Sequence, residues 1–304
     1  MTITRVTQSM MTERSLTGLQ GSLGKLADIQ EHLSTGRILN RPSDSPTGTA
    51  AAMRLRGAIA QQQQFARNAE DGLGWLNTAD ATLQSTNDQL RTARDRALQG
   101  ANAATSPAAR EALATEVEQI RAGVLAAANT SYLGRPIFGG TTAGSTAYAS
   151  ASPGAGLPEV VTYTGDGGSV SRTVAEGVSI EVQVDGEAAF GPDGDSVFDH
   201  LDALAAALRS GDTAAIRAGV DAVTADMDRV GSALANVGAR AVRVEQATVR
   251  AADAETGLAS SLSEIENTDL PQAMVELQMQ EVAYQAALAA TARVLQPSLV
   301  DFLR

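Results

Sequence analysis

Acidic side chains and one histidine gather near residue 195, and they are the residues of this 304-residue chain best suited to chemistry. Asp193, Asp195, Asp199 and His200 carry carboxylate and imidazole groups of the kind that bind metal ions. Their spacing does not fit an EF-hand loop, which needs further ligands and a distal glutamate. Acids are favoured in the first turn of a helix by its dipole. A helix that begins near Ser196 therefore explains them better than a metal does.

A second candidate is the glycine-rich stretch Gly165-Asp166-Gly167-Gly168, which could suggest a phosphate-binding loop. It lacks the strand–glycine–helix context and the lysine of such loops, so we expect a hairpin turn. The chain also shows no nucleophile elbow and no triad-like local pattern. We expect no enzyme activity, no catalytic residue, no metal and no cofactor.

The amino-acid composition narrows the classes of fold and function that this chain can have. Hydrophobic residues make up 43% of the chain but aromatic residues only 3%, a balance that suits packed helices. There is no cysteine, so disulfides and zinc–thiolate sites are excluded. The net charge is −12, with −10 in residues 151–230 and +3 in residues 1–60. These features argue against nucleic-acid binding. No apolar run is long enough to span a membrane and no standard secretory signal is visible, so we expect either a cytoplasmic protein or export by another route.

Leucines at alternating steps of three and four define the first predicted helix, over residues 10–35. Gly36 suits its C-terminal cap. The segment Asn40–Pro46 interrupts the helical pattern, because two prolines four residues apart cannot lie inside a helix. Ser-Pro pairs then predict helix starts at Pro46 and Pro107, with ends near Gly100 and Asn129.

Residues 141–194 have a different character, rich in glycine, serine and threonine. Alternating valine and isoleucine over residues 178–184 predict a strand with one buried face. Residues 160–164 and 170–174 are predicted as two more strands, joined by the glycine-rich turn. We expect a small β-rich insertion.

Helix returns at residues 197–210, and Asp212 can cap the next helix. A nearly unbroken heptad seam from Ile216 to Ile265 predicts a rod of about fifty residues, about 75 Å long at 1.5 Å per residue. Thr268–Pro271 breaks this rod. The last helix again carries apolar residues at heptad positions and approaches the end of the chain, where Pro297 can stop it.

The order of helices and breaks is thus nearly the same from either end of the chain. Pairing the two ends with each other would bury all the apolar seams. The predicted fold is mainly α, with long antiparallel rods, a terminal coiled coil and a β-rich insertion. We predict three domains: residues 1–44 with 268–304, residues 45–140 with 195–267, and residues 141–194.

A self-assembling structural protein fits this pattern best. A chemoreceptor-like coiled coil and an enzyme with an unrecognised site are the alternatives. The predicted assembly interface consists of the terminal seams: Leu16, Leu19, Leu23, Leu26, Leu33, Met274, Leu277, Tyr284, Leu288, Leu295 and Phe302. The predicted joint between domains consists of Asn40, Pro42, Asp44, Pro46, Asp269 and Pro271.

Four stretches resemble the flagellin superfamily, and within it the hook-associated subunits. They are LSTGRILNRPSDSPTGTAAAM near the N-terminus, ANTSYLGRPIFGGTTAG before the insertion, DSVFDHLDALAAAL after it, and LPQAMVELQMQEVAYQAALAATARVLQPSLVDFLR at the C-terminus. Together they cover both ends and both borders of the insertion. Flagellin itself is the alternative within the superfamily.

The resemblance implies an inner layer of terminal helices (D0), a rod layer (D1) and an outer insertion (D2). It implies secretion through the flagellar type III system, with the help of an export chaperone, and assembly at the junction between hook and filament. The implied partners are further copies of the chain, hook-associated protein 1 and flagellin. Neither nucleic acid nor membrane is implied.

Overall fold

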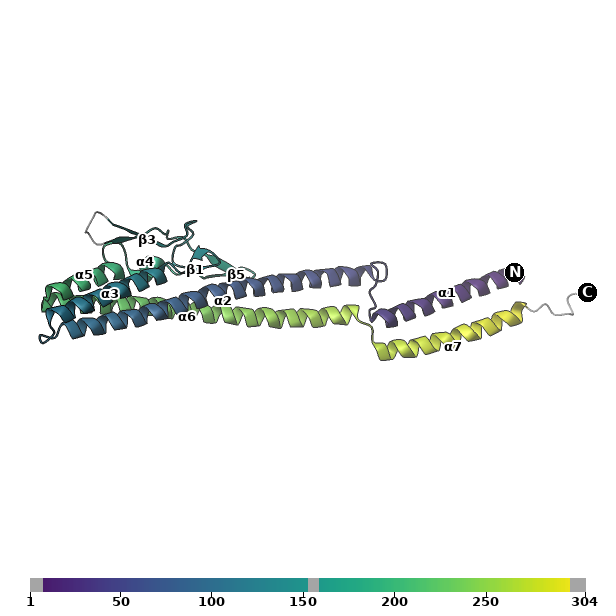
Figure 1. Ribbon diagram of the computed structural model, residues 1–304. Helices are drawn as coiled ribbons and strands as arrows, with labels where there is room; N and C mark the ends of the chain where they lie inside the picture. The colour runs from purple at the N-terminus through teal and green to yellow at the C-terminus, as the bar shows by residue number, and fades with distance from the viewer. Residues whose placement is uncertain (1–7, 153–158, 296–304) are drawn as a thin grey trace, which may run out of the picture. The chain divides into compact units, whose positions relative to one another are not determined.

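The computed structural model describes residues 8–152 and 159–295 and is mainly helical, as predicted (Figure 1). Its helices are α1 (Gln8–Thr35), α2 (Pro46–Gly100), α3 (Pro107–Ala128), α4 (Gly186–Phe190), α5 (Val197–Ser210), α6 (Thr213–Glu266) and α7 (Leu270–Leu295). Its strands are β1 (Ser131–Tyr132), β2 (Arg135–Pro136), β3 (Tyr148–Ala151), β4 (Val160–Tyr163), β5 (Ser171–Ala175) and β6 (Val178–Glu181).

Serine-proline pairs begin the helices as predicted. The Ser45 hydroxyl accepts a hydrogen bond from the Gly48 backbone N–H at 3.1 Å, one residue before α2 begins. Ser106 does the same for Ala109 at 3.2 Å before α3. Proline at the first helical position costs no hydrogen bond, because that N–H has no partner within the helix.

The long rod α6 is one continuous helix of 54 residues. Gly211, with φ of 72°, ends α5 in the left-handed conformation that glycine adopts readily. The Asp212 carboxylate then accepts hydrogen bonds from the backbone N–H groups of Ala214 and Ala215. The predicted break and the predicted cap are both confirmed.

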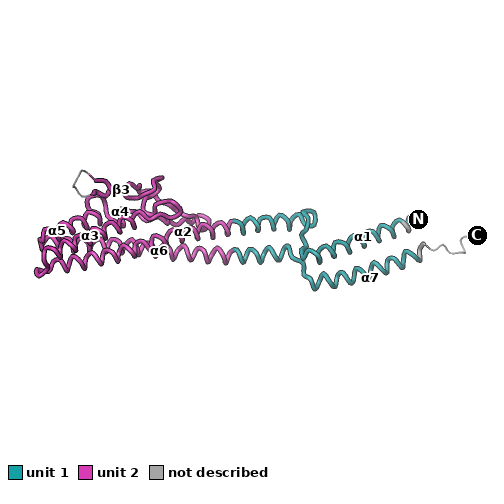
Figure 2. The backbone as a smooth tube through the Cα atoms, in the orientation of Figure 1, with its two compact units in different colours: residues 1–60, 255–304 teal, residues 61–254 magenta. Residues whose placement is uncertain are grey.

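Backbone contacts divide the chain into two compact units (Figure 2). Unit 1 comprises Met1–Ala60 and Glu255–Arg304, and unit 2 comprises Gln61–Ala254. The divisions fall inside α2 and α6. The three-domain division stays a prediction; its terminal part, residues 1–44 with 268–304, lies within unit 1.

Unit 2 has one continuous hydrophobic core, to which α2, α3, α5, α6 and the insertion all contribute. Its largest fully buried side chains include Trp75 of α2, Leu204 of α5 and Ile216 of α6. An ion pair with 2.8 Å between Nε of Arg121 and Oδ2 of Asp202 joins α3 to α5. The core is therefore a helical bundle with the insertion packed against it.

The described strands form three separate antiparallel pairs: β1–β2 lies just before the insertion, and β3–β4 and β5–β6 lie within it. The predicted hairpin between residues 160–164 and 170–174 is wrong, because β4 pairs with β3 and β5 pairs with β6. The loop between them is held instead by Asp166, whose carboxylate accepts hydrogen bonds from the backbone N–H and the hydroxyl of Thr141. These bonds lower the pKa of Asp166.

The strand predicted over residues 178–184 is shorter than expected. β6 ends at Glu181, and the predicted alternation does not continue beyond it, because Gln183 is buried together with Val182 and Val184. Val178 is exposed. Asp185 then caps the short helix α4, which the sequence pattern did not reveal.

Candidate assembly interface

The first and last helices pair with each other inside unit 1. Gln280 of α7 donates a hydrogen bond of 2.9 Å to the Ser22 hydroxyl of α1. The Thr268 backbone N–H donates to the Gly36 carbonyl at 3.0 Å. The paired positions run in opposite directions, so the helices are antiparallel. We call α1 and α7 the terminal helix pair.

Only part of the predicted seam is covered within this pair. Leu19, Leu26, Leu33, Leu277 and Tyr284 are half-buried. Within residues 270–292 of α7, Ala273 and Thr291 are the most buried side chains.

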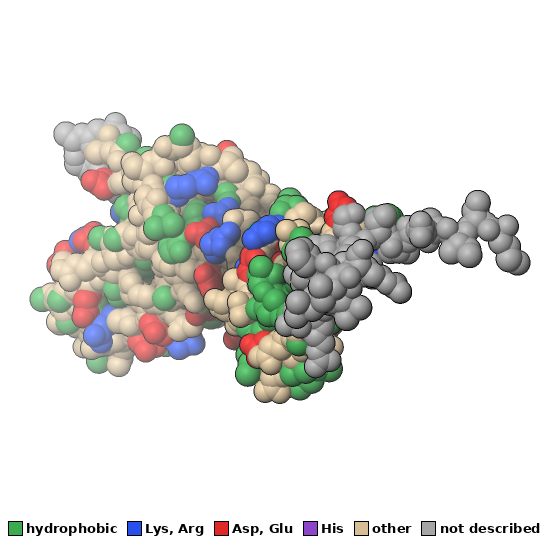
Figure 3. Space-filling view, turned by 90° about the vertical axis from the view of Figure 1, so that its right-hand side faces the viewer, with side chains coloured by type: hydrophobic (Ala, Val, Ile, Leu, Met, Phe, Trp, Pro, Cys, Tyr) green, Lys and Arg blue, Asp and Glu red, His purple; other side chains and the backbone are tan. Residues whose placement is uncertain are grey.

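Other seam residues lie on the surface. Leu16, Leu23, Met274 and Leu288 are exposed. Leu295 is the last residue of α7, and Phe302 lies outside the described residues. Figure 3 shows hydrophobic side chains, in green, at the molecular surface.

A second apolar stripe on α7 was not predicted. Val275, Met279 and Val282 are exposed, and Val282 is 66% exposed. Their spacing of four and three residues places them on one helix face, away from Leu277 and Tyr284. The spacing was visible in the sequence, but the heptad seam accounted for the helix without it.

The exposed apolar side chains of α1 and α7 can stabilise a complex if a partner buries them. Burying one large aliphatic side chain contributes about 1.5–3 kcal/mol. Contiguous apolar surface on a protein typically marks an interaction site. The terminal helix pair therefore exposes apolar side chains of the kind that interaction surfaces bury.

The first break of the chain is organised by Asp44. Its Oδ2 accepts hydrogen bonds from the backbone N–H groups of Asn40 at 3.0 Å and Arg41 at 2.7 Å. The bond from the Arg41 N–H is the main cause of the lowered pKa of Asp44. The Asn40 amide donates to the Thr35 hydroxyl and so ties the loop back to α1. Pro42 is exposed between these contacts.

The second break contains the cap of α7. Oδ1 of Asp269 accepts a hydrogen bond from the Gln272 backbone N–H at 3.1 Å. Pro271 is the second residue of α7, where a proline nitrogen leaves no partner unsatisfied.

The two breaks are also tied to each other, which the sequence did not predict. Arg37 and Asn267 form an isolated antiparallel β-bridge, and the Ile38 N–H donates to the Glu266 carbonyl at 2.7 Å. The Glu266 side chain is 7% exposed and pairs with Arg56 at 2.7 Å. We call residues 36–46 and 266–271, with this bridge, the joint. No local pattern could indicate partners so far apart in the chain.

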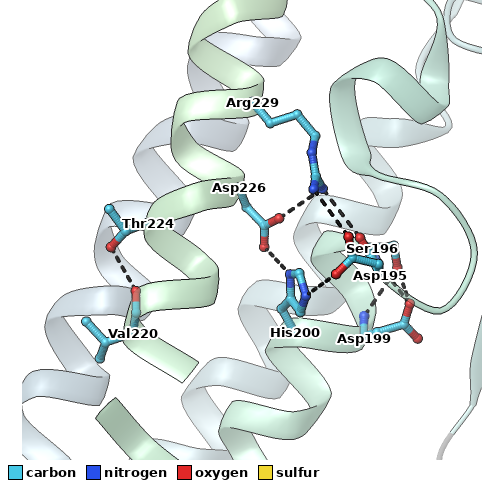
Figure 4. Close-up of polar contacts among 8 residues, drawn as sticks. All are labelled: Asp195, Ser196, Asp199, His200, Val220, Thr224, Asp226 and Arg229. Carbon is cyan, nitrogen blue, oxygen red and sulfur yellow. Dashed lines mark hydrogen bonds and ion pairs between the residues drawn. The ribbon is translucent and has the colours of Figure 1, made fainter. Parts of the chain in front are cut away.

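The acids considered for chemistry serve the fold of unit 2 (Figure 4). Asp199 forms a capping box with Ser196 at the start of α5, as the helix-start explanation predicted. Asp193 accepts a hydrogen bond from the Tyr163 backbone N–H at 2.9 Å. Asp195 pairs with His200 at 3.1 Å. Among the described residues, no three His, Cys, Asp or Glu side chains are placed to hold a metal ion.

Within residues 8–152 and 159–295, no helix combines the length and the apolarity that a membrane crossing requires.

Two protein-family models match the chain. The model of the bacterial flagellin N-terminal helical region matches residues 6–143. The model of the bacterial flagellin C-terminal helical region matches residues 220–303. Together they account for well over half of the chain, including both terminal helices.

Individual proteins that are similar to the chain are also flagellar proteins. Flagellar hook-associated protein 3 of Salmonella typhimurium is 29% identical over 137 residues, which are 45% of this chain and 43% of that protein. B-type flagellin of Pseudomonas aeruginosa is 33% identical over 126 residues, 41% of this chain and 25% of that protein. The chain thus spans less than half the length of these curated relatives.

A solved structure shares the fold. Flagellar hook associated protein-3 from Legionella pneumophila superposes with a TM-score of 0.62, at 14% identity, over 70% of this chain and 98% of that one. At this identity the likeness speaks for the arrangement of helices.

Proposed function

The chain belongs to the bacterial flagellin family, and on that premise we propose that it is a structural subunit at the junction between the flagellar hook and the flagellin filament. The observation that carries this proposal is the half-covered terminal helix pair, on a chain whose two ends both match flagellin. A subunit that works alone has no use for such a surface.

We propose that the chain polymerises through the terminal helix pair and the seam residues named above. The exposed positions Leu16, Leu23, Met274 and Leu288 support this, because copies packed side by side can bury them. The antiparallel pairing of α1 with α7 within one copy leaves the stripe at Val275, Met279 and Val282 for other contacts.

The proposed layering follows the predicted domains. Residues 1–44 with 268–304 form the inner layer, residues 45–140 with 195–267 the rod layer, and residues 141–194 the outer layer. The joint, with Asn40, Pro42, Asp44, Pro46, Asp269 and Pro271, is the proposed link between the inner and rod layers. The hydrogen bonds that Asp44 accepts support a stiff link at this point.

The proposed partners are other copies of the chain, hook-associated protein 1 on one side and flagellin on the other, with an export chaperone before assembly. Secretion by the flagellar type III route and a place at the hook–filament junction follow from the same proposal. The role is non-catalytic and needs no cofactor.

Flagellin, the filament subunit, is the second candidate. It is favoured by the 33% identity to the B-type flagellin. Two features favour the junction role over it: the hook-associated relative matches a longer stretch, and the insertion between the helical regions is small.

Deletion of the chain in its host distinguishes these roles. For a junction subunit we expect cells with hooks but without filaments, and flagellin free in the medium. For a filament subunit we expect no such release of another flagellin. Normal filaments on the deleted strain would refute both roles. Re-expression of the chain is the control.

A further inference from the structure

The turn of the β1–β2 hairpin contains a leucine, Leu133, whose backbone conformation and exposure are both unusual for this residue type. Tyr132 pairs with Arg135, so Leu133 and Gly134 alone form the turn. Both have positive φ, 50° and 78°, as a type I′ turn requires. Asparagine or glycine usually occupies the first position, and a bulky residue there costs about 1–2 kcal/mol. Leu133 is also 80% exposed.

This tip is held firmly by its base. The ring of Tyr132 packs edge-on against buried Trp75, with 5.8 Å between ring centroids. It also lies so close to Gly74 of α2 that a Cβ there would collide with it. Ile137 and Phe138, directly after β2, are fully buried. Leu133 is therefore a rigidly presented apolar knob.

A groove with an apolar floor, which could accept the Leu133 side chain, lies elsewhere on unit 2. It has a volume of about 290 Å³ and lies between α6 and the segment that leads into α4. Buried Val184, Ala233 and Val237 form its apolar floor, and exposed Asp185 and Asn236 lie on its rim. Such a floor suits a single aliphatic side chain.

The knob carries a positive charge, and the groove rim carries negative charges together with Arg240, whose guanidinium pairs with Glu181 at 3.5 Å. Arg135 follows Leu133 by two residues and is exposed, with its guanidinium carbon 6.0 Å from the Trp75 ring centroid. The groove rim carries Asp185, and Glu187 lies beside it on α4. Opposite charges that flank an apolar contact help to fix its register.

The knob and the groove lie at the same level along the helices of unit 2. Tyr132, at the base of the knob, packs at Gly74 of α2, and Val182 packs two residues away, at Gly72. Arg240 of α6, at the end of the groove, donates to the carbonyl of Gln183, the residue after Val182. Two copies placed side by side at equal height can therefore bring one copy's knob to the other's groove.

We propose that Leu133 of one copy seats in the groove formed by Val184, Ala233 and Val237 of a second copy, with Arg135 facing Asp185. The inference rests on the proposed assembly and adds a contact outside the terminal helices. It joins two different surfaces, so it is a head-to-tail contact of the kind that builds rings or helical arrays. It also explains why a strained leucine occupies the turn.

The test uses the absence of cysteine from the chain. Two single-cysteine full-length variants, Leu133→Cys and Ala188→Cys, are co-expressed in the deleted host, and isolated flagella are mildly oxidised. Ala188 is exposed on the groove wall. We expect a disulfide-linked dimer of the two variants, in yield about tenfold above a control pair of Leu98→Cys with Ala188→Cys, because the proposed contact brings position 133 of one copy close to position 188 of the other. Leu98 is a leucine on α2 that is also exposed, at 54%.

Filaments without an excess of this dimer would overturn the contact but leave the junction role standing. A cross-link from Leu133→Cys to another flagellar protein would overturn the second copy as the occupant. Loss of filaments even with the unaltered chain supplied would overturn the junction role and this contact with it.

Variants that remove a charge can distinguish an effect on the contact between copies from an effect on folding. Asp185→Asn removes the charge while asparagine still caps α4. Both Asp185→Asn and Arg135→Gln are expected to lower the cross-link yield of the cysteine pair severalfold, with unchanged thermal unfolding of the monomer. Unchanged yields in both would contradict the proposed pairing.

Discussion

The imidazole of His200 on α5 lies 2.8 Å through Nδ1 from Oδ2 of Asp226 on α6, a carboxylate with 0% exposure (Figure 4). Arg229 approaches the other oxygen of Asp226 at 3.1 Å. Nε2 of His200 lies 3.1 Å from Oδ1 of Asp195. Burial raises the pKa of Asp226, and the hydrogen bond from His200 opposes that rise. The network fixes the start of α5, where the chain leaves the insertion, against α6.

Asp226→Ala is expected to destabilise unit 2 by about 3 kcal/mol, because it leaves His200 and Arg229 without their shared buried partner. Urea unfolding followed by circular dichroism measures the change. Asp228→Ala, an exposed acid on the same helix, serves as the control and should stay within about 0.5 kcal/mol of the unaltered protein. Equal effects in the two variants would show that the network adds no stability.

Stability in acid should depend on Glu118 of α3. Both oxygens of its carboxylate accept hydrogen bonds from Arg209 of α5, which lowers the pKa of Glu118 below its ordinary value of 4.5. A lowered folded pKa stabilises the protein above pH 4.5, and this contribution is lost as the pH falls through the folded pKa.

We therefore expect the unfolding midpoint in urea to fall with acidification less steeply in Glu118→Gln than in the unaltered chain. The difference between the two proteins should be largest near neutral pH and should vanish in strong acid. Glu245→Gln, at an exposed glutamate of α6, is the control. Parallel pH profiles for all three proteins would count against this role of Glu118.

Leu288→Asp is expected to abolish incorporation at the hook tip. Leu288 is exposed on α7, so the substitution places a charge on a surface that we propose to be buried in the assembly. Unit 2 should keep its thermal unfolding transition, since α7 belongs to unit 1. Gln285→Asp introduces the same charge at an exposed polar position of α7 and should be tolerated. Normal filament growth with Leu288→Asp would refute the seam as an interface.

Hydrogen exchange of the unassembled protein should be fast in α1 and α7 and slow in α2 of unit 2. The terminal helix pair covers only one face of each helix, so its ordering is expected to be completed on assembly, when the remaining seam residues are buried. Exchange is measured by mass spectrometry before and after assembly. Strong protection of residues 16–33 and 277–295 in the unassembled protein would rule this out.

Arg56→Ala should loosen the joint. The buried carboxylate of Glu266 loses its cationic partner, at an expected cost of about 1 kcal/mol, since the arginine itself is largely exposed. The amide protons of Ile38 and Thr268, which donate across the joint, should then exchange faster. Arg54→Ala, at an exposed arginine that bonds only within its own helix, is the matched control.

Local signals explain how far the sequence could predict this fold. Ser45-Pro46, Ser106-Pro107 and Gly211-Asp212 act within one turn of a helix, and the structure places helix ends where they predicted. Heptad spacing identified the seams but not which seam residues a single copy covers. That depends on how the two terminal helices turn toward each other.

Strand pairing and the joint could not be predicted in the same way. The glycines at 165–168 looked like a hairpin because hairpin turns are local, yet β4 finds its partner in β3. The tie of Arg37 to Asn267 and of Arg56 to Glu266 depends on contacts between the two ends of the chain. The seam residues and the joint residues stay predictions until assembly is tested.

The pairing of the first helix with the last also sets a time at which the molecule can be completed. Ser22 and Gln280 are 258 positions apart, so no partial chain that lacks either end can form this contact. A chain that emerges gradually, from a ribosome or through a narrow channel, must release nearly its whole length first. Until then each terminal helix is without its intrachain partner. The fold thereby makes the surface that we propose to polymerise the last part of the chain to form.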